Sequence, residues 1–246
     1  MKEEVAVENL REIKDVLDKN NINYWLDLGT LLGAVRDGKI IKWDTDVDLG
    51  SWYSNATQII SAFRQLKKGQ FSVVLRRKRA LISIRMKLGY VVNATLYRKK
   101  GDYAWNVWIM REKRIQLPLR YVLDILSKEK YTMPRGAFVG KIERLSSLLP
   151  SRLKHLLADA TWSILNKCGC VILPVIPKSY FEKLSSIHFY GMEFKTPSDV
   201  KKYLEFRYGS GWKIPTKNWI YYRDDGAISR KHSKSTRKAE RVGNAK

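Results

Sequence analysis

The sequence contains little cysteine and little histidine. Cys168 and Cys170 are the two cysteines among 246 residues, and the three histidines lie far apart without metal-ligand spacing. This pattern excludes a disulfide framework and argues against a structural zinc site, which needs a full set of cysteine or histidine ligands. We therefore expect two unpaired thiols in a chain suited to a reducing compartment.

Long hydrophobic runs are also absent. The longest is Cys168–Ile176, which Pro174 interrupts, whereas a membrane-spanning helix needs about 20 apolar residues. The first ten residues, MKEEVAVENL, are charged and lack the apolar centre of a signal peptide. We therefore expect a cytoplasmic protein, with peripheral attachment at the inner face of the membrane left open.

Acidic residues are scarce relative to basic ones. The chain has 24 Asp and Glu against 47 Lys and Arg, which gives a formal net charge of +23. Such a balance indicates an anionic partner, which is nucleic acid, an anionic membrane or a phosphorylated substrate. Residues 229–246 carry almost no apolar side chains, so we expect a disordered basic tail there that binds lipid head groups or RNA, or aids solubility.

Five of the 24 acidic residues lie in one informative stretch, Tyr24–Gly50, with the sequence YWLDLGTLLGAVRDGKIIKWDTDVDLG. Asp44, Asp46 and Asp48 alternate with Thr45, Val47 and Leu49, so on a strand the three carboxylates share one face. Three crowded negative charges need a compensating cation. We predict that Asp46 and Asp48 bind Mg²⁺ or Mn²⁺, and that Asp44 is a further catalytic candidate. The alternative is a solvated acidic turn.

A phosphate-binding arrangement precedes these carboxylates. Gly29-Thr30 follows an expected strand, Tyr24–Leu28, and begins an expected helix, Leu31–Arg36. Thr30 would cap the helix, and backbone N–H groups at its start would hold a phosphate. Arg36 would add a fixed positive charge. By itself, this spacing indicates a metal ion and a phosphate, without specifying the substrate.

The order of strand, Gly-Thr turn, helix and Asp-x-Asp strand resembles the nucleotidyltransferase fold of the DNA polymerase beta superfamily. The longer stretch WLDLGTLLGAVRDGKIIKWDTDVDLG resembles the signature of the LicD/fukutin family. That resemblance implies an α+β fold with a mixed sheet flanked by helices. It also implies transfer of a phosphate-linked group, such as phosphocholine or ribitol phosphate, from a CDP-activated donor to a glycan.

The stretch Ser185–Ile228 carries a second match to the family, in the same order. The resemblance implies that Trp212 and Lys213 line the donor pocket and that Asp224 and Asp225 close it. Alternatively, Trp212 anchors a helix to the core. The matching positions are Gly191, Pro197, Tyr203-Leu204, Tyr208-Gly209, Trp212 and Pro215.

One position departs from the family pattern. In this fold a third carboxylate comes from a later strand, and the matching residue in the expected strand Tyr90–Tyr97 is Asn93. An amide offers one neutral oxygen and no charge. The departure puts the metal affinity, or the number of metal ions, in doubt.

We expect one catalytic domain over residues 1–228, with a helical insert within residues 98–184. Apolar periodicity predicts helices at Glu3–Lys19, Thr57–Leu66 and Arg144–Lys167, and successive strands between residues 71 and 97. The leucine stripe of the third helix favours packing on the core. The alternative is an interfacial helix on an anionic membrane.

Three functions remain open. The favoured one is metal-dependent transfer of a phosphate-linked group from a CDP-linked donor, of the CDP-choline or CDP-alditol type, to a sugar or glycolipid acceptor. The second is transfer of a nucleoside monophosphate to RNA, a protein or a small molecule. The third is a catalytically degenerate basic scaffold that binds RNA or an anionic membrane.

Overall fold

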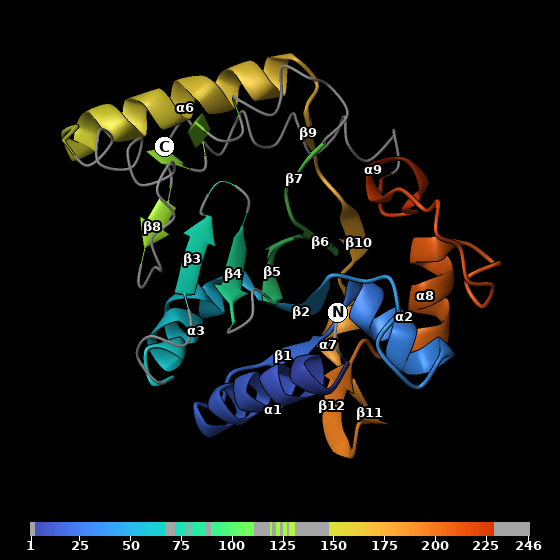
Figure 1. Cartoon of the computed structure of the whole chain (residues 1–246). Coiled ribbons are helices and arrows are strands. Elements are labelled where there is room, and N and C mark those ends of the chain that lie inside the picture. Colours follow the sequence, from blue (N-terminus) through green and yellow to red (C-terminus); the bar gives the residue numbers. More distant parts are fainter. Residues whose placement is uncertain are drawn as a thin grey trace.

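The fold is built around one mixed β-sheet (Figure 1). The computed structural model describes residues 3–66, 72–76, 78, 80–86, 90–110, 119, 122–123, 125–126, 128–130 and 148–228. The predicted basic tail, 229–246, lies outside the described residues. The α+β architecture, with a mixed sheet flanked by helices, is confirmed.

The main sheet has the strand order β1-β2-β5-β4-β3-β8, and β6 joins β5 to β10. Strands β2 and β5 are parallel, and the other described pairs are antiparallel. The parallel register sets Asp48 beside Asn93. The strands are β1 (Tyr24–Leu26), β2 (Asp46–Trp52), β3 (Ser72–Arg76), β4 (Leu81–Arg85), β5 (Val91–Lys100), β6 (Tyr103–Trp105), β8 (Lys128–Lys130) and β10 (Val175–Pro177).

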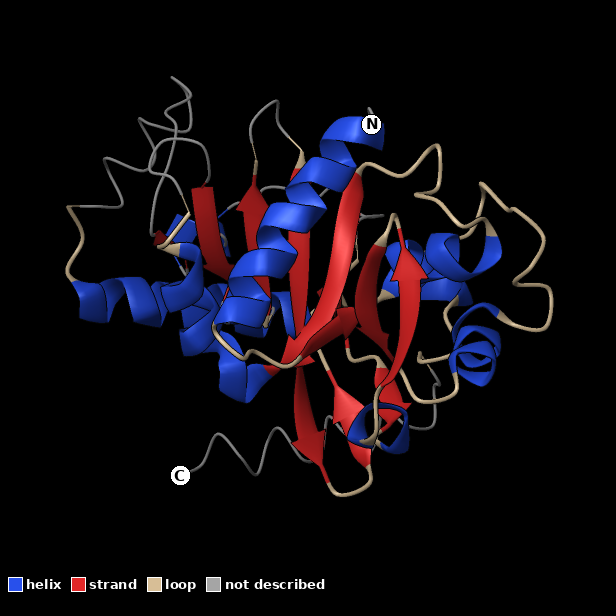
Figure 2. Cartoon of the chain, turned by 90° about the horizontal axis from the view of Figure 1, so that it is seen from below, coloured by secondary structure: helices blue, strands red, loops and turns tan. Residues whose placement is uncertain are grey.

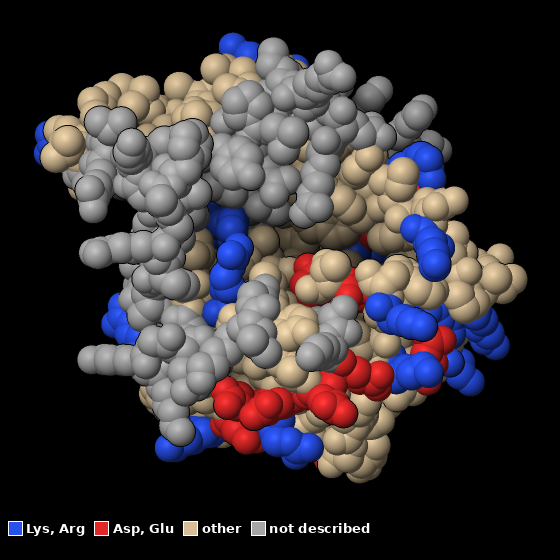
Figure 3. All heavy atoms as spheres, viewed as in Figure 1, with Lys and Arg blue, Asp and Glu red and all other residues tan. Residues whose placement is uncertain are grey.

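Helix α1 (Glu3–Lys19) lies across one face of the sheet (Figure 2) and has the predicted bounds. Its buried side chains Leu10, Ile13 and Leu17 recur at helical spacing, so the apolar stripe enters the core. Acidic side chains gather over α1 at the surface (Figure 3), so the net positive charge is unevenly distributed. A short 3-10 turn, Tyr53–Asn55, leads into α3 (Ala56–Phe63), which begins one residue before the predicted helix and ends three residues earlier.

The junction of β1 and α2 differs from the prediction. Strand β1 ends at Leu26, and α2 (Leu28–Arg36) begins three residues earlier than expected. The reason is Asp27, whose carboxylate accepts a hydrogen bond of 2.9 Å from the Leu28 N–H and caps the helix. Thr30 therefore lies inside the first turn and is not the cap.

The segment expected to be a helical insert contributes strands as well as helices. Helix α6 (Ser151–Lys167) covers the end of the predicted helix, whose first residues, 144–147, are outside the described part. Strands β7 (Trp108–Ile109) and β9 (Val171–Ile172) pair with each other. With α6 they enclose a second small core, formed by Val107, Ile109, Leu123, Ala158, Leu165, Cys170, Val171 and Leu173.

The C-terminal part completes the main core. It consists of α7 (Ser179–Glu182), the hairpin of β11 (Ser185–Phe189) and β12 (Met192–Thr196), α8 (Val200–Tyr208) and α9 (Tyr221–Asp224). Gly191 turns the hairpin at a φ of +72°, a left-handed conformation that favours glycine. Cys168 and Cys170 are both free thiols. Within the described ranges, no helix is long and apolar enough to cross a bilayer.

Candidate active site

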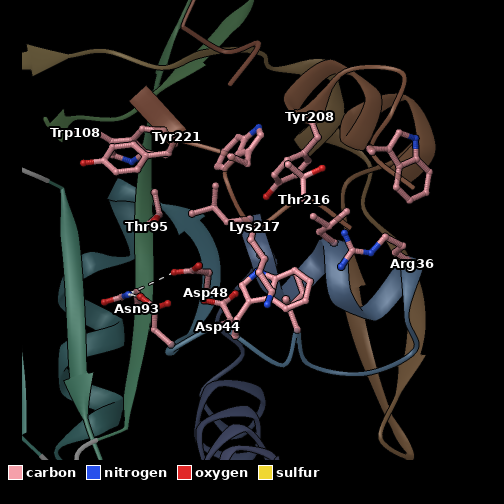
Figure 4. A pocket seen from close by; sticks show the side chains of 18 of the residues that line it. Arg36, Asp44, Asp48, Asn93, Thr95, Trp108, Tyr208, Thr216, Lys217 and Tyr221 are labelled. Atoms are coloured by element: carbon pink, nitrogen blue, oxygen red, sulfur yellow. Dashed lines mark hydrogen bonds between the residues drawn. The ribbon is translucent and has the colours of Figure 1, made fainter. Parts of the chain in front are cut away.

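A cavity of about 410 Å³ lies between the sheet and the C-terminal segment (Figure 4). Asp44, Asp46 and Asp48 contribute to one wall, and Asn93 lies beside them. The volume is within the range of about 300–1,000 Å³ that is usual for small-molecule sites. Aromatic side chains also line it: Trp43, Trp108, Tyr208, Trp212, Trp219 and Tyr221.

Strand β2 presents Asp46 and Asp48 on one face, as the alternation predicted. Val47 and Leu49, on the other face, are buried in the main core. Asp44 differs from the prediction, because it precedes the strand. Its N–H donates to the Ile41 carbonyl at 2.9 Å, and its carboxylate accepts from the Thr45 N–H at 3.0 Å. This turn nevertheless brings Asp44 to the same cavity as Asp46 and Asp48.

Asn93 holds the two strand carboxylates through its amide nitrogen. The Nδ2 group donates to Asp46 Oδ2 at 2.8 Å and to Asp48 Oδ1 at 3.4 Å. The residue thus faces the site, where the strand alignment placed it. Its amide points N–H groups, and not the oxygen, toward the carboxylates.

The orientation of this amide follows from its second partner. Arg76 Nη1 donates to Ser83 Oγ at 2.7 Å, so the Ser83 hydroxyl directs its own proton to Asn93 Oδ1, at 2.9 Å. A guanidinium has donors only. The direction of the whole chain of hydrogen bonds is therefore set by Arg76, and it leaves the Asn93 Nδ2 for Asp46 and Asp48.

The carboxylates repel one another in a partly buried setting. Burial, followed by the charge of Asp46, raises the pKa of Asp44 to about 7. Burial also raises the pKa of Asp48 well above its usual range, and the charges of Asp46 and Asp44 add to the effect. In the part of the chain that the structure describes, no Lys or Arg forms an ion pair with any of the three. The negative charge of the three carboxylates is therefore not balanced by a basic side chain among the described residues, and a bound cation would reduce their repulsion.

These residues fit a magnesium site in which the protein would supply only part of the ligand shell. Among the described residues, no group of three or more His, Cys, Asp or Glu side chains is arranged as a complete set of metal ligands. Mg²⁺ commonly takes one or two carboxylates and completes its shell with substrate phosphates and water. Asp46 and Asp48 match that partial donor set.

Gly29 and Thr30 connect α2 to the acidic strand. Thr30 Oγ1 accepts a hydrogen bond of 2.8 Å from the Asp48 N–H and so fixes β2 against the helix. A Cβ atom on Gly29 would lie 2.4 Å from Asp44 Oδ2, so a larger residue here would displace the Asp44 carboxylate. Gly29 lines the cavity at the first turn of α2. Arg36 also lines the cavity, and its guanidinium binds the Asp37 carboxylate at 2.7 and 2.9 Å.

The predicted C-terminal site residues separate into two groups. Trp212 lines the cavity and is also buried in the main core, so both of its predicted roles are compatible with its position. Lys213 is exposed and, with Asp224 and Asp225, is not among the described residues that line the cavity. Asp224 pairs with Arg223, and Asp225 pairs with the buried Arg207.

The structure adds Trp108, Lys217 and Tyr221 to the predicted cavity residues. Trp108 and Tyr221 are in edge-to-face contact, with ring centroids 5.0 Å apart, above the carboxylates (Figure 4). The Lys217 ammonium lies 5.5 Å from the ring centre of Trp43, which is 44% exposed. For Tyr221, the available signal was the density of aromatic residues after Tyr203. The periodicity of the sequence could not tell which of these aromatic residues face the cavity.

Replacing Asn93 with aspartate should lower stability without metal and raise the response to Mg²⁺. The change removes the amide donor and adds a negative charge beside Asp46 and Asp48, so we expect a loss of about 1–3 kcal/mol in EDTA. Melting curves in EDTA and in Mg²⁺ would measure both effects. Asn93→Ala is the matched control, because it loses the donor without adding charge. Equal melting of Asn93→Asp and the unaltered protein in EDTA would contradict the assigned hydrogen bonds.

Comparison with known proteins identifies the region that carries this site. Residues 21–127 match the family model described as LicD/FKTN/FKRP, nucleotidyltransferase domain. An uncharacterized protein of Rickettsia typhi is 43% identical over 60 residues, which are 23% of this chain and 19% of that protein. The human ribitol 5-phosphate transferase FKRP is 54% identical over 43 residues, or 18% of this chain and 9% of FKRP.

A longer and weaker match extends over most of the chain. The human ribitol-5-phosphate transferase FKTN is 24% identical over 219 residues, which are 89% of this chain and 35% of FKTN. In each case the match spans a minor part of the curated relative. Among solved structures, the lincomycin-bound lincosamide adenylyltransferase LnuA aligns over 90% of this chain and 94% of its own, with 11% identity and a TM-score of 0.41.

The family match includes α2, β2 and Asn93, and therefore the acidic wall of the cavity. The resemblance predicted from the Gly-Thr and Asp-x-Asp motifs is thereby confirmed. Residues 21–127 of this chain resemble the nucleotidyltransferase domain of the LicD/FKTN/FKRP proteins.

Proposed function

We propose that this protein transfers a phosphate-linked group from a CDP-activated donor, of the CDP-alditol or CDP-choline type, to a hydroxyl of a sugar or glycolipid. The observation that carries the proposal is the pair Asp46 and Asp48, which face a cavity without an ion-pair partner among the described residues. The family supports a transferase of phosphate-containing groups, since FKRP and FKTN are named ribitol phosphate transferases.

In the proposed reaction, an acceptor hydroxyl oxygen attacks the phosphorus that carries the alditol or choline group. The new oxygen–phosphorus bond forms as the bond from that phosphorus to the bridging oxygen breaks, and CMP leaves with the bonding electrons. The acceptor loses one proton. Asp44 is the candidate to receive it, on its position beside the other two carboxylates.

Each side chain has a separate task in this proposal. Asp46 and Asp48 hold Mg²⁺ or Mn²⁺, which supplies charge neutralisation at the donor phosphates. Asn93 keeps both carboxylates in place through its amide hydrogens. The first turn of α2, at Gly29, offers backbone N–H groups to a phosphate, and Arg36 offers its guanidinium. The aromatic wall opposite contacts the base or the transferred group.

Ligand-dependent stability tests the proposal. We expect CDP-ribitol or CDP-choline with Mg²⁺ to raise the melting temperature, because a ligand at about 100 times its dissociation constant adds about 2.7 kcal/mol. Asp48→Asn should abolish the increase, whereas Asp15→Asn, an exposed change on α1, should preserve it. A response to ATP alone would favour transfer of a nucleoside monophosphate. No Mg²⁺-dependent response to any nucleotide would reject the phosphotransferase and favour a binding scaffold.

A further inference from the structure

Helix α6 exposes the apolar stripe that the sequence analysis favoured as a core-packing surface. Leu153, Leu156, Leu157 and Ile164 are 39%, 65%, 39% and 46% exposed. They recur at intervals of three, four and seven residues, so they form one continuous face of the helix. Leu148, just before the helix, is 80% exposed.

The other side of α6 is firmly packed. Ala158, Thr161 and Leu165 are buried, and Ala158 and Leu165 belong to the second small core. The Thr161 hydroxyl donates to the Leu157 carbonyl at 2.8 Å and so leaves no polar group of that residue unsatisfied. One side of the helix therefore packs on the small core, and the leucine face is exposed. The helix itself runs along one edge of the molecule (Figure 1).

Basic residues accompany the leucine face. The helix carries Arg152, Lys154 and Lys167 against one acidic residue, Asp159. Asp159 is itself neutralised by an ion pair with Lys78. The face is thus apolar with a positive surround, which is the pattern of helices that lie in the interface of an anionic bilayer. A second copy of this chain, with a net charge of +23, would bring like charges together at the same face.

We propose that α6 docks this protein onto an anionic lipid bilayer, with its leucine face in the boundary between head groups and acyl chains. The location of α6 relates this docking to the cavity. Val107 and Ile109 belong to the small core under α6 and also line the cavity. Docking would therefore bring the cavity close to the bilayer, which selects a lipid-linked glycan as the acceptor. This last step rests on the proposed function.

Vesicle co-sedimentation of the full chain tests the docking. We expect binding to vesicles that contain phosphatidylglycerol and at least tenfold weaker binding to vesicles of phosphatidylcholine alone. The double variant Leu153→Gln/Leu156→Gln should bind the anionic vesicles at least tenfold more weakly. Tyr103→Gln, which alters an exposed aromatic residue on β6, is the matched control and should bind normally.

Two outcomes would overturn the inference. Unchanged vesicle binding by the double leucine variant would show that charge alone attaches the chain. Conversion of a dimer to a monomer by the same variant, measured by light scattering, would show that a second copy covers the face. The nucleotide-dependent melting shift separates this inference from the proposed function. A normal shift without vesicle binding contradicts only the docking, and vesicle binding without a shift contradicts only the proposed chemistry.

Discussion

Asp48→Asn should reduce the rate of phosphate-group transfer by about a thousandfold, or roughly 4 kcal/mol of transition-state stabilisation. The asparagine keeps the shape of the side chain and can still accept the hydrogen bond from Asn93 Nδ2. The contact between the Asp48 N–H and Thr30 involves the backbone and is retained. The variant therefore removes the negative charge and little else. Initial rates with a CDP-linked donor and a glycan acceptor would measure the effect.

The same variant should be more stable than the unaltered protein in the absence of metal. Asp44, Asp46 and Asp48 crowd one wall, and removing one charge relieves repulsion worth roughly 0.5–2 kcal/mol. Urea unfolding in EDTA would measure this gain, with Asp15→Asn as the control that changes neither property. Loss of activity together with loss of stability would point instead to a structural role for Asp48.

Asp225→Asn should lower the free energy of unfolding by about 3–5 kcal/mol, because it leaves a buried guanidinium without its counter-ion. The side chains of Arg207 and Asp225 are 1% and 0% exposed. Three hydrogen bonds of 2.5–2.9 Å join them. Denaturant unfolding followed by circular dichroism would measure the loss.

Two further variants give this prediction its controls. Asp159→Asn breaks an ion pair whose carboxylate is 60% exposed, and it should cost less than about 1 kcal/mol. Arg207→Met/Asp225→Leu replaces both charges with apolar side chains and should recover about half of the loss or more. If Asp225→Asn is as mild as Asp159→Asn, the buried pair does not hold the C-terminal segment.

The ion pair of Arg207 and Asp225 is one end of a buried network of hydrogen bonds that reaches helix α2. Arg207 Nη1 donates to the Tyr203 hydroxyl at 2.9 Å, and that hydroxyl donates to Asp27 Oδ1 at 2.7 Å. The Tyr97 hydroxyl donates to the other oxygen of Asp27 at 2.5 Å. Asp27 in turn caps α2. The C-terminal segment is therefore connected to the acidic wall by hydrogen bonds as well as through the cavity.

Much of the local structure was predictable because it depends on neighbours in sequence. The apolar periodicity of α1 gave its bounds, and the alternation of Asp46 with Val47 gave the face of β2 that carries the carboxylates. The start of α2 was missed, since two residues, Asp27 and Thr30, are each able to cap a helix. Asp27 does so while Thr30 binds the Asp48 backbone, a contact between residues 18 positions apart.

The sequence by itself determined the resemblance to LicD/FKTN/FKRP over residues 21–127, the acidic strand and the excess of positive charge, because each of these is a property of residue order or composition. Only the tertiary structure decided which groups meet. In the structure, the hydrogen bond from Ser83 orients the Asn93 amide so that its nitrogen faces Asp46. Asp225 is buried against Arg207, and the leucine face of α6 is exposed. An apolar stripe at helical spacing has the same pattern whether it meets a core or solvent. The choice depends on distant segments, here the small core that accepts Ala158 and Leu165 on the other side of the helix.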